Sequence, residues 1–140
     1  MSLPNPDQVL IDLAQYLMEG LNALVADTDI VVVKGLSVNA ADQYRNFPLL
    51  GVYRRVSRGD RLEECEVEII YYASALNEAI YFRWLEQRII ELLQNFLYGK
   101  ANCLKLTGGF TSRQGVVRTH DNLMLAQLRI VCTIIDTHTL

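Results

Sequence analysis

Two neighbouring stretches decide the fold: PLLGVYRRV at residues 48–56 and LEECEVEIIYY at residues 62–72. Both are rich in the β-branched and aromatic residues that strands favour. The SRGD sequence at residues 57–60, which separates them, has the residue types of a tight turn. We therefore predict that the two stretches form a long β-hairpin.

Side chains in the second stretch alternate between two faces, because successive residues of a strand point to opposite sides of a sheet. One face would carry Cys65, Val67, Ile69, Tyr71 and Ala73. The other would carry Glu64, Glu66, Glu68, Ile70 and Tyr72. We expect the first face to be core and the second to be largely acidic.

The carboxylates of Glu64, Glu66 and Glu68 would then leave one face within about 14 Å, at ~3.4 Å per residue. This stripe can be an ordinary solvated sheet face, neutralised across the hairpin by Arg54 or Arg55. It can also line a channel, where it would repel DNA phosphate. A metal site is less favoured, because no Asp or His lies nearby in sequence to complete the oxygen coordination.

Helices are predicted on both sides of this hairpin. Asn5, Pro6 and Gln8 have the pattern of a helix start, and an apolar stripe at three- and four-residue steps follows from Val9 to Leu24. A second helix is expected to begin at a cap on Ser74 or Asn77 and to end at Gly99.

The second helix has an aromatic flank beside its core stripe. Tyr81, Trp84 and Arg88 lie on this flank at helical spacing. They can simply cover the edge of the sheet, but aromatic rings beside an arginine are typical of subunit interfaces. We favour the interface for these three residues.

The rest of the chain completes a sheet. Residues 30–33, IVVV, are predicted to form a buried strand, and residues 37–46 a surface loop. A second loop is expected over residues 107–115, followed by a hairpin of strands 116–120 and 123–136. In the last strand the face with Met124, Ala126 and Leu128 should meet the helices.

The order of these elements is helix, strand, hairpin, helix, hairpin. It predicts one α+β domain over residues 1–140, with a mainly antiparallel sheet and two long helices packed on one face. The chain is 51% hydrophobic and 21% charged, which is too apolar for intrinsic disorder.

Composition limits the partners. The 13 basic and 16 acidic residues give a net charge of −3, which argues against tight non-specific DNA binding. The apolar runs are far shorter than a membrane span requires, and residues 1–6, MSLPNP, lack the features of a signal peptide. We therefore expect an intracellular protein without membrane contact.

Catalytic and metal-binding signatures are absent from the sequence. It has no glycine-rich phosphate loop, no HExxH and no GxSxG. His120 lies in an expected turn and His138 in the carboxyl-terminal tail, where neither would be held rigidly beside a substrate. Cys65, Cys103 and Cys132 are too widely spaced for a zinc site, so we expect buried thiols. We predict no enzyme activity, no cofactor and no metal.

The whole pattern resembles the tail terminator proteins of long-tailed bacteriophages. The resemblance rests on the amphipathic first helix, the PLLGVY strand at residues 48–53, the alternating strand at residues 64–72, the long second helix and the terminal hairpin. It implies a structural virion protein, assembled in the host cytoplasm, whose hexameric ring caps the tail tube at its head-proximal end. It also implies contacts with the tube protein, the head connector and, in contractile tails, the sheath, with DNA passing through without specific binding.

The family offers no residue motif to transfer, so the candidate sites come from this sequence alone. We expect Glu64, Glu66 and Glu68 to line the channel. The polar segments at residues 37–46 and 107–115 are expected to dock on partners, with candidate contacts at Asp42, Tyr44, Arg45, Phe110 and Arg113.

Two alternatives stay open. One is a neck or head-completion ring protein. The other is a small intracellular ligand-binding or enzymatic α+β domain, which would use the sheet face around Glu64, Glu66 and Arg54 as a pocket.

Overall fold

A computed structural model describes residues 6–38, 47–57, 65–100, 104–119 and 122–136. Its helical elements are α1 (Pro6–Ala23), the short 3₁₀ helix η1 (Leu76–Tyr81) and α2 (Phe82–Lys100). Its strands are β1 (Gly35–Ser37), β2 (Leu49–Ser57), β3 (Cys65–Tyr72), β4 (Leu104–Arg118) and β5 (Met124–Asp136).

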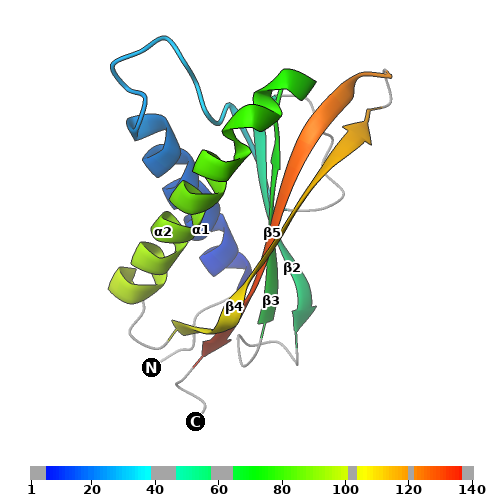
Figure 1. Ribbon diagram of the computed structural model, residues 1–140. Helices are drawn as coiled ribbons and strands as arrows, with labels where there is room; N and C mark the ends of the chain where they lie inside the picture. The colour runs from blue at the N-terminus through cyan, green and yellow to red at the C-terminus, as the bar shows by residue number, and fades with distance from the viewer. Residues whose placement is uncertain (1–5, 39–46, 58–64, 101–103, 120–121, 137–140) are drawn as a thin grey trace.

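The strands form a single sheet in the order β1-β2-β3-β5-β4 (Figure 1). Neighbouring strands are antiparallel except β1 and β2, which are parallel. Both helices pack against each other and on the same face of the sheet (Figure 1). The predicted α+β class with a mainly antiparallel sheet is therefore confirmed.

The main core fills the space between the helices and the sheet. Leu13 and Leu17 of α1 and Ile89 of α2 are fully buried there against Ile69 of β3 and Ile130 of β5. The helix-facing sides predicted for β3 and β5 are confirmed for Val67, Ile69, Tyr71 and Ala73 and also for Ala126, Leu128, Ile130, Cys132 and Ile134, which all belong to this core. The prediction is wrong for Met124, which is exposed at the start of β5, beyond the part of the strand that the core covers.

The opposite face of the sheet carries a second, smaller apolar cluster. Leu49 and Tyr53 of β2 are buried there with Ile70 and Tyr72 of β3. The expectation of a largely acidic face is therefore wrong for this end of β3. The reason is the neighbouring strand, since β2 adds its own apolar side chains to the same face.

Residues 30–33 are not a strand, which corrects the prediction. Their β-branched composition favours extended backbone, but a side chain takes the place of a neighbouring strand. The Asn22 Oδ1 accepts hydrogen bonds from the backbone N–H groups of Val32 (3.0 Å) and Val33 (2.9 Å), and the Asn22 Nδ2 donates to the Val33 carbonyl (2.9 Å). Sheet pairing begins further along, at Gly35.

The predicted loop at residues 107–115 is also wrong, because these residues belong to the continuous strand β4. Gly and Ser are poor strand formers, but β5 offers a long partner with which β4 pairs from Leu104 to Arg118. The ladder is irregular between Thr107 and Thr111, where three residues of β4 face one residue of β5. Such a bulge absorbs extra residues without ending the strand.

The start of the second helix also differs from prediction. Ala75 occupies the N-cap of η1 without a side-chain hydrogen bond. Ser74 instead donates to the Glu78 carboxylate at 2.7 Å, and Asn77 lies within η1. At the other end, α2 extends to Lys100, so Gly99 lies inside the helix and not beyond it.

Candidate functional site

Exposed apolar side chains gather at one end of the molecule. Of the eleven large apolar side chains that are exposed among the described residues, ten lie in the turn after α1, in η1, in the first turn of α2, or near the β4–β5 turn. Figure 1 places these elements at the same end of the fold. They are Leu24, Ile30, Val31, Leu76, Ile80, Tyr81, Trp84, Val116, Leu123 and Met124.

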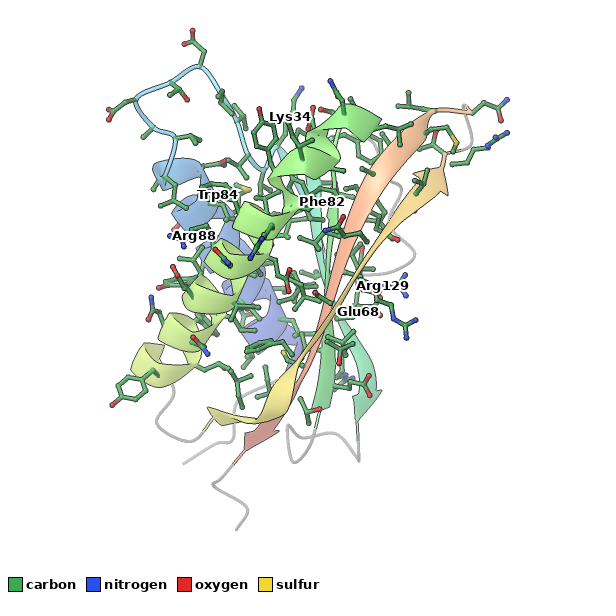
Figure 2. All side chains as sticks on the ribbon, viewed as in Figure 1. Lys34, Glu68, Phe82, Trp84, Arg88 and Arg129 are labelled. Carbon is green, nitrogen blue, oxygen red and sulfur yellow. The ribbon has the colours of Figure 1, made fainter. Side chains whose placement is uncertain are left out.

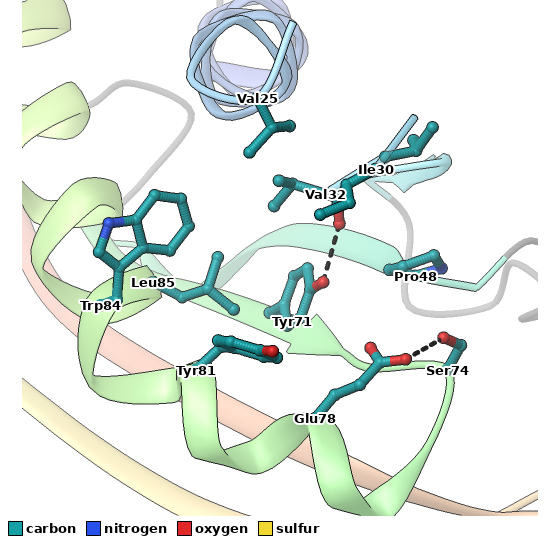
Figure 3. A pocket seen from close by; sticks show the side chains of 11 residues that line it. Val25, Ile30, Val32, Pro48, Tyr71, Ser74, Glu78, Tyr81, Trp84 and Leu85 are labelled. Atoms are coloured by element: carbon teal, nitrogen blue, oxygen red, sulfur yellow. Dashed lines mark hydrogen bonds between the residues drawn. The ribbon is translucent and has the colours of Figure 1, made fainter. Parts of the chain in front are cut away.

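An apolar groove of about 670 Å³ opens at this end. One wall is the segment between α1 and β1, the other is η1 with the first turns of α2, and Tyr71 of β3 lies between them (Figure 3). The groove residues are Val25, Ile30, Val31, Val32, Pro48, Tyr71, Ser74, Glu78, Tyr81, Trp84 and Leu85.

Two of the predicted interface residues meet in this groove. Tyr81 and Trp84 both line it, and both are exposed, Trp84 by 38% of its surface. The third, Arg88, is not among the lining residues and forms an ion pair with Glu91 of its own helix at 3.1 Å (Figure 2). The sequence therefore indicated one wall of the groove.

The sequence did not predict the opposite wall, because the composition of residues 30–33 favours a buried strand. A signal was available in the sequence. Asn22 interrupts the apolar positions of the first helix, and a polar residue there needs a hydrogen-bonding partner. Its bonds to the backbone of Val32 and Val33 bury those two side chains and leave Ile30 and Val31 exposed at the rim.

Tyr71 contacts both walls of the groove. Its phenol donates to the Val32 carbonyl at 2.8 Å (Figure 3), and its ring contacts the Phe82 ring edge-to-face at 6.1 Å. Burial, and then the negative charge of Glu78, raise the pKa of the Tyr71 phenol well above its ordinary value. Tyr71 is therefore a neutral structural donor at physiological pH, and it fixes the shape of the groove.

The acidic stripe does not present three equivalent carboxylates. Glu68 is only 9% exposed, and its carboxylate lies 3.9 Å from the guanidinium of Arg129 on β5, on the side of the sheet away from the helices (Figure 2). Glu66 is half-buried, and Glu64 lies outside the described residues. Part of the charge of this stripe is thus compensated within the chain.

Arg54 does not lie on the same face of the sheet as Glu68. It pairs with Val67, whose side chain belongs to the helix-facing core, whereas Glu68 pairs with Tyr53 on the other face. Paired residues of neighbouring strands share a face, so Arg54 and Glu68 lie on opposite sides of the sheet. The side chain of Arg55 lies outside the described residues.

The docking candidates fall into two groups. Asp42, Tyr44 and Arg45 lie outside the described residues. Phe110 is half-buried and packs against the main core, whereas Arg113 is exposed on β4. Next to Arg113, Ser112 donates to Glu86 of α2 at 2.6 Å and so links this strand to the helix.

Neither a metal site nor a membrane-spanning helix is found within the described ranges. There, no three His, Cys, Asp or Glu side chains are grouped so that they could hold a metal ion. Within the same part of the chain, no helix is both long and apolar enough to cross a membrane. Cys132 is buried and is not part of a disulfide, and His120 and His138 lie outside the described residues.

Fold and groove together define a small α+β domain with an apolar, solvent-open end. No family model matches the sequence, and no curated protein is significantly similar to it.

Proposed function

We propose that this protein is a tail terminator of a long-tailed bacteriophage. In this role a hexameric ring of copies caps the tail tube, ends tube polymerisation and forms the joint to the head connector. Its partners are further copies of itself, the tube protein, the connector and, in a contractile tail, the sheath. The proposal draws on the resemblance in element order together with the apolar end of the fold.

The observation that carries this proposal is the concentration of exposed apolar side chains at one end. Scattered apolar residues are normal on a monomer, but exposed apolar side chains gathered at one end of a fold favour a surface that another protein covers. Trp and Tyr, which both line the groove, are the residues most often found at the energetic centre of interfaces. A structural protein that functions only when assembled would have such a surface.

The acidic face is proposed to line the channel through which DNA passes. Carboxylates release no phosphate counterions, so a duplex would slide past them without being held. Glu68 is buried whereas Glu66 is half-buried, so a substitution at Glu66 disturbs the fold less and is the better test of this role. We expect Glu66→Lys virions to eject DNA more slowly than the parent, and an unchanged ejection rate would contradict the channel role.

The test of the terminator role is deletion of the gene from the phage that carries it. Without a terminator nothing stops tube growth, so electron micrographs should show headless tails of uncontrolled length, and the gene supplied in trans should restore normal tails. Tails of normal length that fail to join heads would instead indicate a neck protein. Normal virions would exclude both roles.

A second candidate function is suggested by the groove itself. Its volume of about 670 Å³ lies within the range of small-molecule sites, and its lining is mostly apolar. A ligand-binding domain would bind an apolar probe such as 1-anilinonaphthalene-8-sulfonate with one-to-one stoichiometry and quench Trp84. Weak binding without saturation would argue against this function.

A further inference from the structure

A second apolar patch lies beside the β4–β5 turn. We call it the hairpin patch and define it by Val116, Arg118, Leu123 and Met124, all of which are exposed. Arg118 pairs with Met124 across the hairpin, and Val116 lies two residues along β4 on the same face. The patch therefore combines three apolar side chains with one cation.

Hydrogen bonds link the two strands beside the hairpin patch. The backbone N–H of Thr119 donates to the Leu123 carbonyl at 2.9 Å, and the N–H of Leu123 donates to the Thr119 hydroxyl at 3.2 Å. Asn122 adopts a left-handed backbone conformation with φ of 60°, which asparagine tolerates well. Backbone hydrogen bonds of this kind reduce the conformational entropy that the patch would lose on docking.

The groove and the hairpin patch lie on opposite flanks of the same element. In Figure 1, η1 and the start of α2 separate the segment between α1 and β1 from the β4–β5 turn. A copy can therefore present its patch to one neighbour while its groove accepts the patch of another. Such a contact is head-to-tail, and it closes into a ring when the rotation between copies permits.

The charges of the two surfaces are complementary. The groove contains Glu78, and the segment that forms its outer wall carries the exposed residues Asp27, Asp29 and Lys34, for a net charge of −2 with Glu78 included. The hairpin patch carries Arg118, and Arg113 is exposed further along the same strand. Opposite charges at the rim of an apolar contact favour one partner and one orientation.

We propose that the hairpin patch of one copy docks into the groove of the next copy. Val116, Leu123 and Met124 then cover Ile30, Tyr81 and Trp84, with Arg118 beside Glu78. The number of copies in the ring rests on the proposed terminator function. The junction itself is a property of this chain in solution.

The experiment uses two double variants at exposed positions, so the fold should be retained. Ile30→Glu with Tyr81→Glu blocks the groove, and Val116→Glu with Leu123→Glu blocks the patch. We expect the parent to form oligomers in sedimentation velocity and each double variant to be monomeric. An equimolar mixture of the two should form dimers and nothing larger, because it contains one intact groove and one intact patch.

Controls separate docking from unfolding and from general loss of apolar surface. Circular dichroism should show that both double variants are folded. Tyr98→Glu removes the most exposed aromatic side chain, 91% exposed at the far end of α2, and should assemble like the parent. Trp84 is the only tryptophan, so a blue shift of its emission should accompany every assembly step that fills a groove.

A charge exchange tests the orientation. Glu78→Arg and Arg118→Glu should each weaken self-association by roughly three- to tenfold. In a mixture of the two variants, the groove changed by Glu78→Arg meets the patch changed by Arg118→Glu, and the unchanged groove of one variant meets the unchanged patch of the other. Both kinds of junction are then complementary, so mixing should restore the oligomers that the parent forms.

The inference fails if the parent is monomeric at every concentration up to its solubility limit. It also fails if oligomers form and the groove and patch variants leave them intact. These outcomes differ from failure of the terminator role. If deletion of the gene leaves virions normal while the junction behaves as described, only the terminator role is wrong.

Discussion

At the scale of single residues, a few side chains form hydrogen bonds to the backbone that neighbouring strands form elsewhere in the fold. Asn22 holds the backbone of Val32 and Val33 through three hydrogen bonds, and the Tyr71 phenol donates a hydrogen bond to the Val32 carbonyl. These contacts define the outer wall of the groove. They also explain why an apolar β-branched segment can pack beside α1 without joining the sheet.

Replacing Asn22 by alanine should therefore destabilise the protein. The change leaves two backbone N–H groups and one carbonyl of a half-buried segment without their partner, and we expect a loss of about 2–3 kcal/mol. Guanidinium unfolding followed by circular dichroism measures it. Asn95→Ala, at an exposed position on α2, is the matched control and should change stability by less than about 0.5 kcal/mol. Equal losses for the two variants would contradict the role of Asn22.

Gly51 is a second residue whose type is explained by its surroundings. A Cβ atom there would lie 2.5 Å from the ring of Tyr53, which is held by a hydrogen bond from its hydroxyl to Ser37 at 3.0 Å. Gly51→Ala should displace this ring and cost about 1–3 kcal/mol of stability. Gly109→Ala meets nothing within 4 Å and should change stability by less than about 0.5 kcal/mol. Thermal melts of the two variants compare them directly.

Tyr71 gives stability a dependence on alkaline pH. Its raised pKa means that the folded state holds the phenolic proton more tightly than the unfolded state. This contribution is fully present below the ordinary tyrosine pKa of about 10 and is lost as pH rises above it. Tyr71→Phe should flatten the decline in urea-unfolding free energy above about pH 10, while losing about 1 kcal/mol at neutral pH. Tyr98→Phe, at an exposed position, should keep the parent's pH profile.

At the scale of elements, the sheet decides what individual strands could not show. The sequence between Thr107 and Gly115 predicts a loop, but β5 is a continuous partner for this part of β4, and a bulge accommodates the extra residues. β3 reads as having one acidic face, but β2 adds apolar residues beside its Ile70–Tyr72 end and β5 adds Arg129 beside Glu68. In both cases the neighbouring strand determines the surroundings of the side chains or backbone in question.

The Glu68–Arg129 contact has a measurable consequence. Glu68→Lys would place a second cation at a buried position beside Arg129, and we expect a loss of about 1–3 kcal/mol. The contact is partly open to solvent on the Arg129 side, so the loss should be smaller than for a fully buried pair. Glu19→Lys, exposed on α1, is the control for the change of net charge. If both variants unfold at the same urea concentration, Glu68 is in practice solvated.

At the scale of the whole molecule, the fold has two different ends. The end with η1 and the β4–β5 turn carries nearly all the large apolar side chains that are exposed in the described residues, and Tyr98 lies at the other end of α2. An asymmetric distribution of apolar surface between the two ends is suited to assembly in one direction. It is the reason that we place both the junction between copies and the capping role at this end.

The sequence by itself determined the class of the fold and the faces of its elements. The apolar stripe of the first helix and the alternation in residues 67–73 and 126–134 place the main core correctly, because periodicity depends only on the local geometry of helix and strand. It also indicated Tyr81 and Trp84 as surface aromatics.

Only the tertiary structure decided the groove, the surroundings of Glu68 and the strand at residues 107–115. Each depends on a partner distant in the chain: Asn22 for residues 32–33, Arg129 for Glu68, and β5 for β4. A hydrogen bond or an ion pair forms only between groups that are close in the folded structure. The local periodicity of a sequence does not say which distant groups will be close. The walls of the groove are brought together only when the helices pack on the sheet.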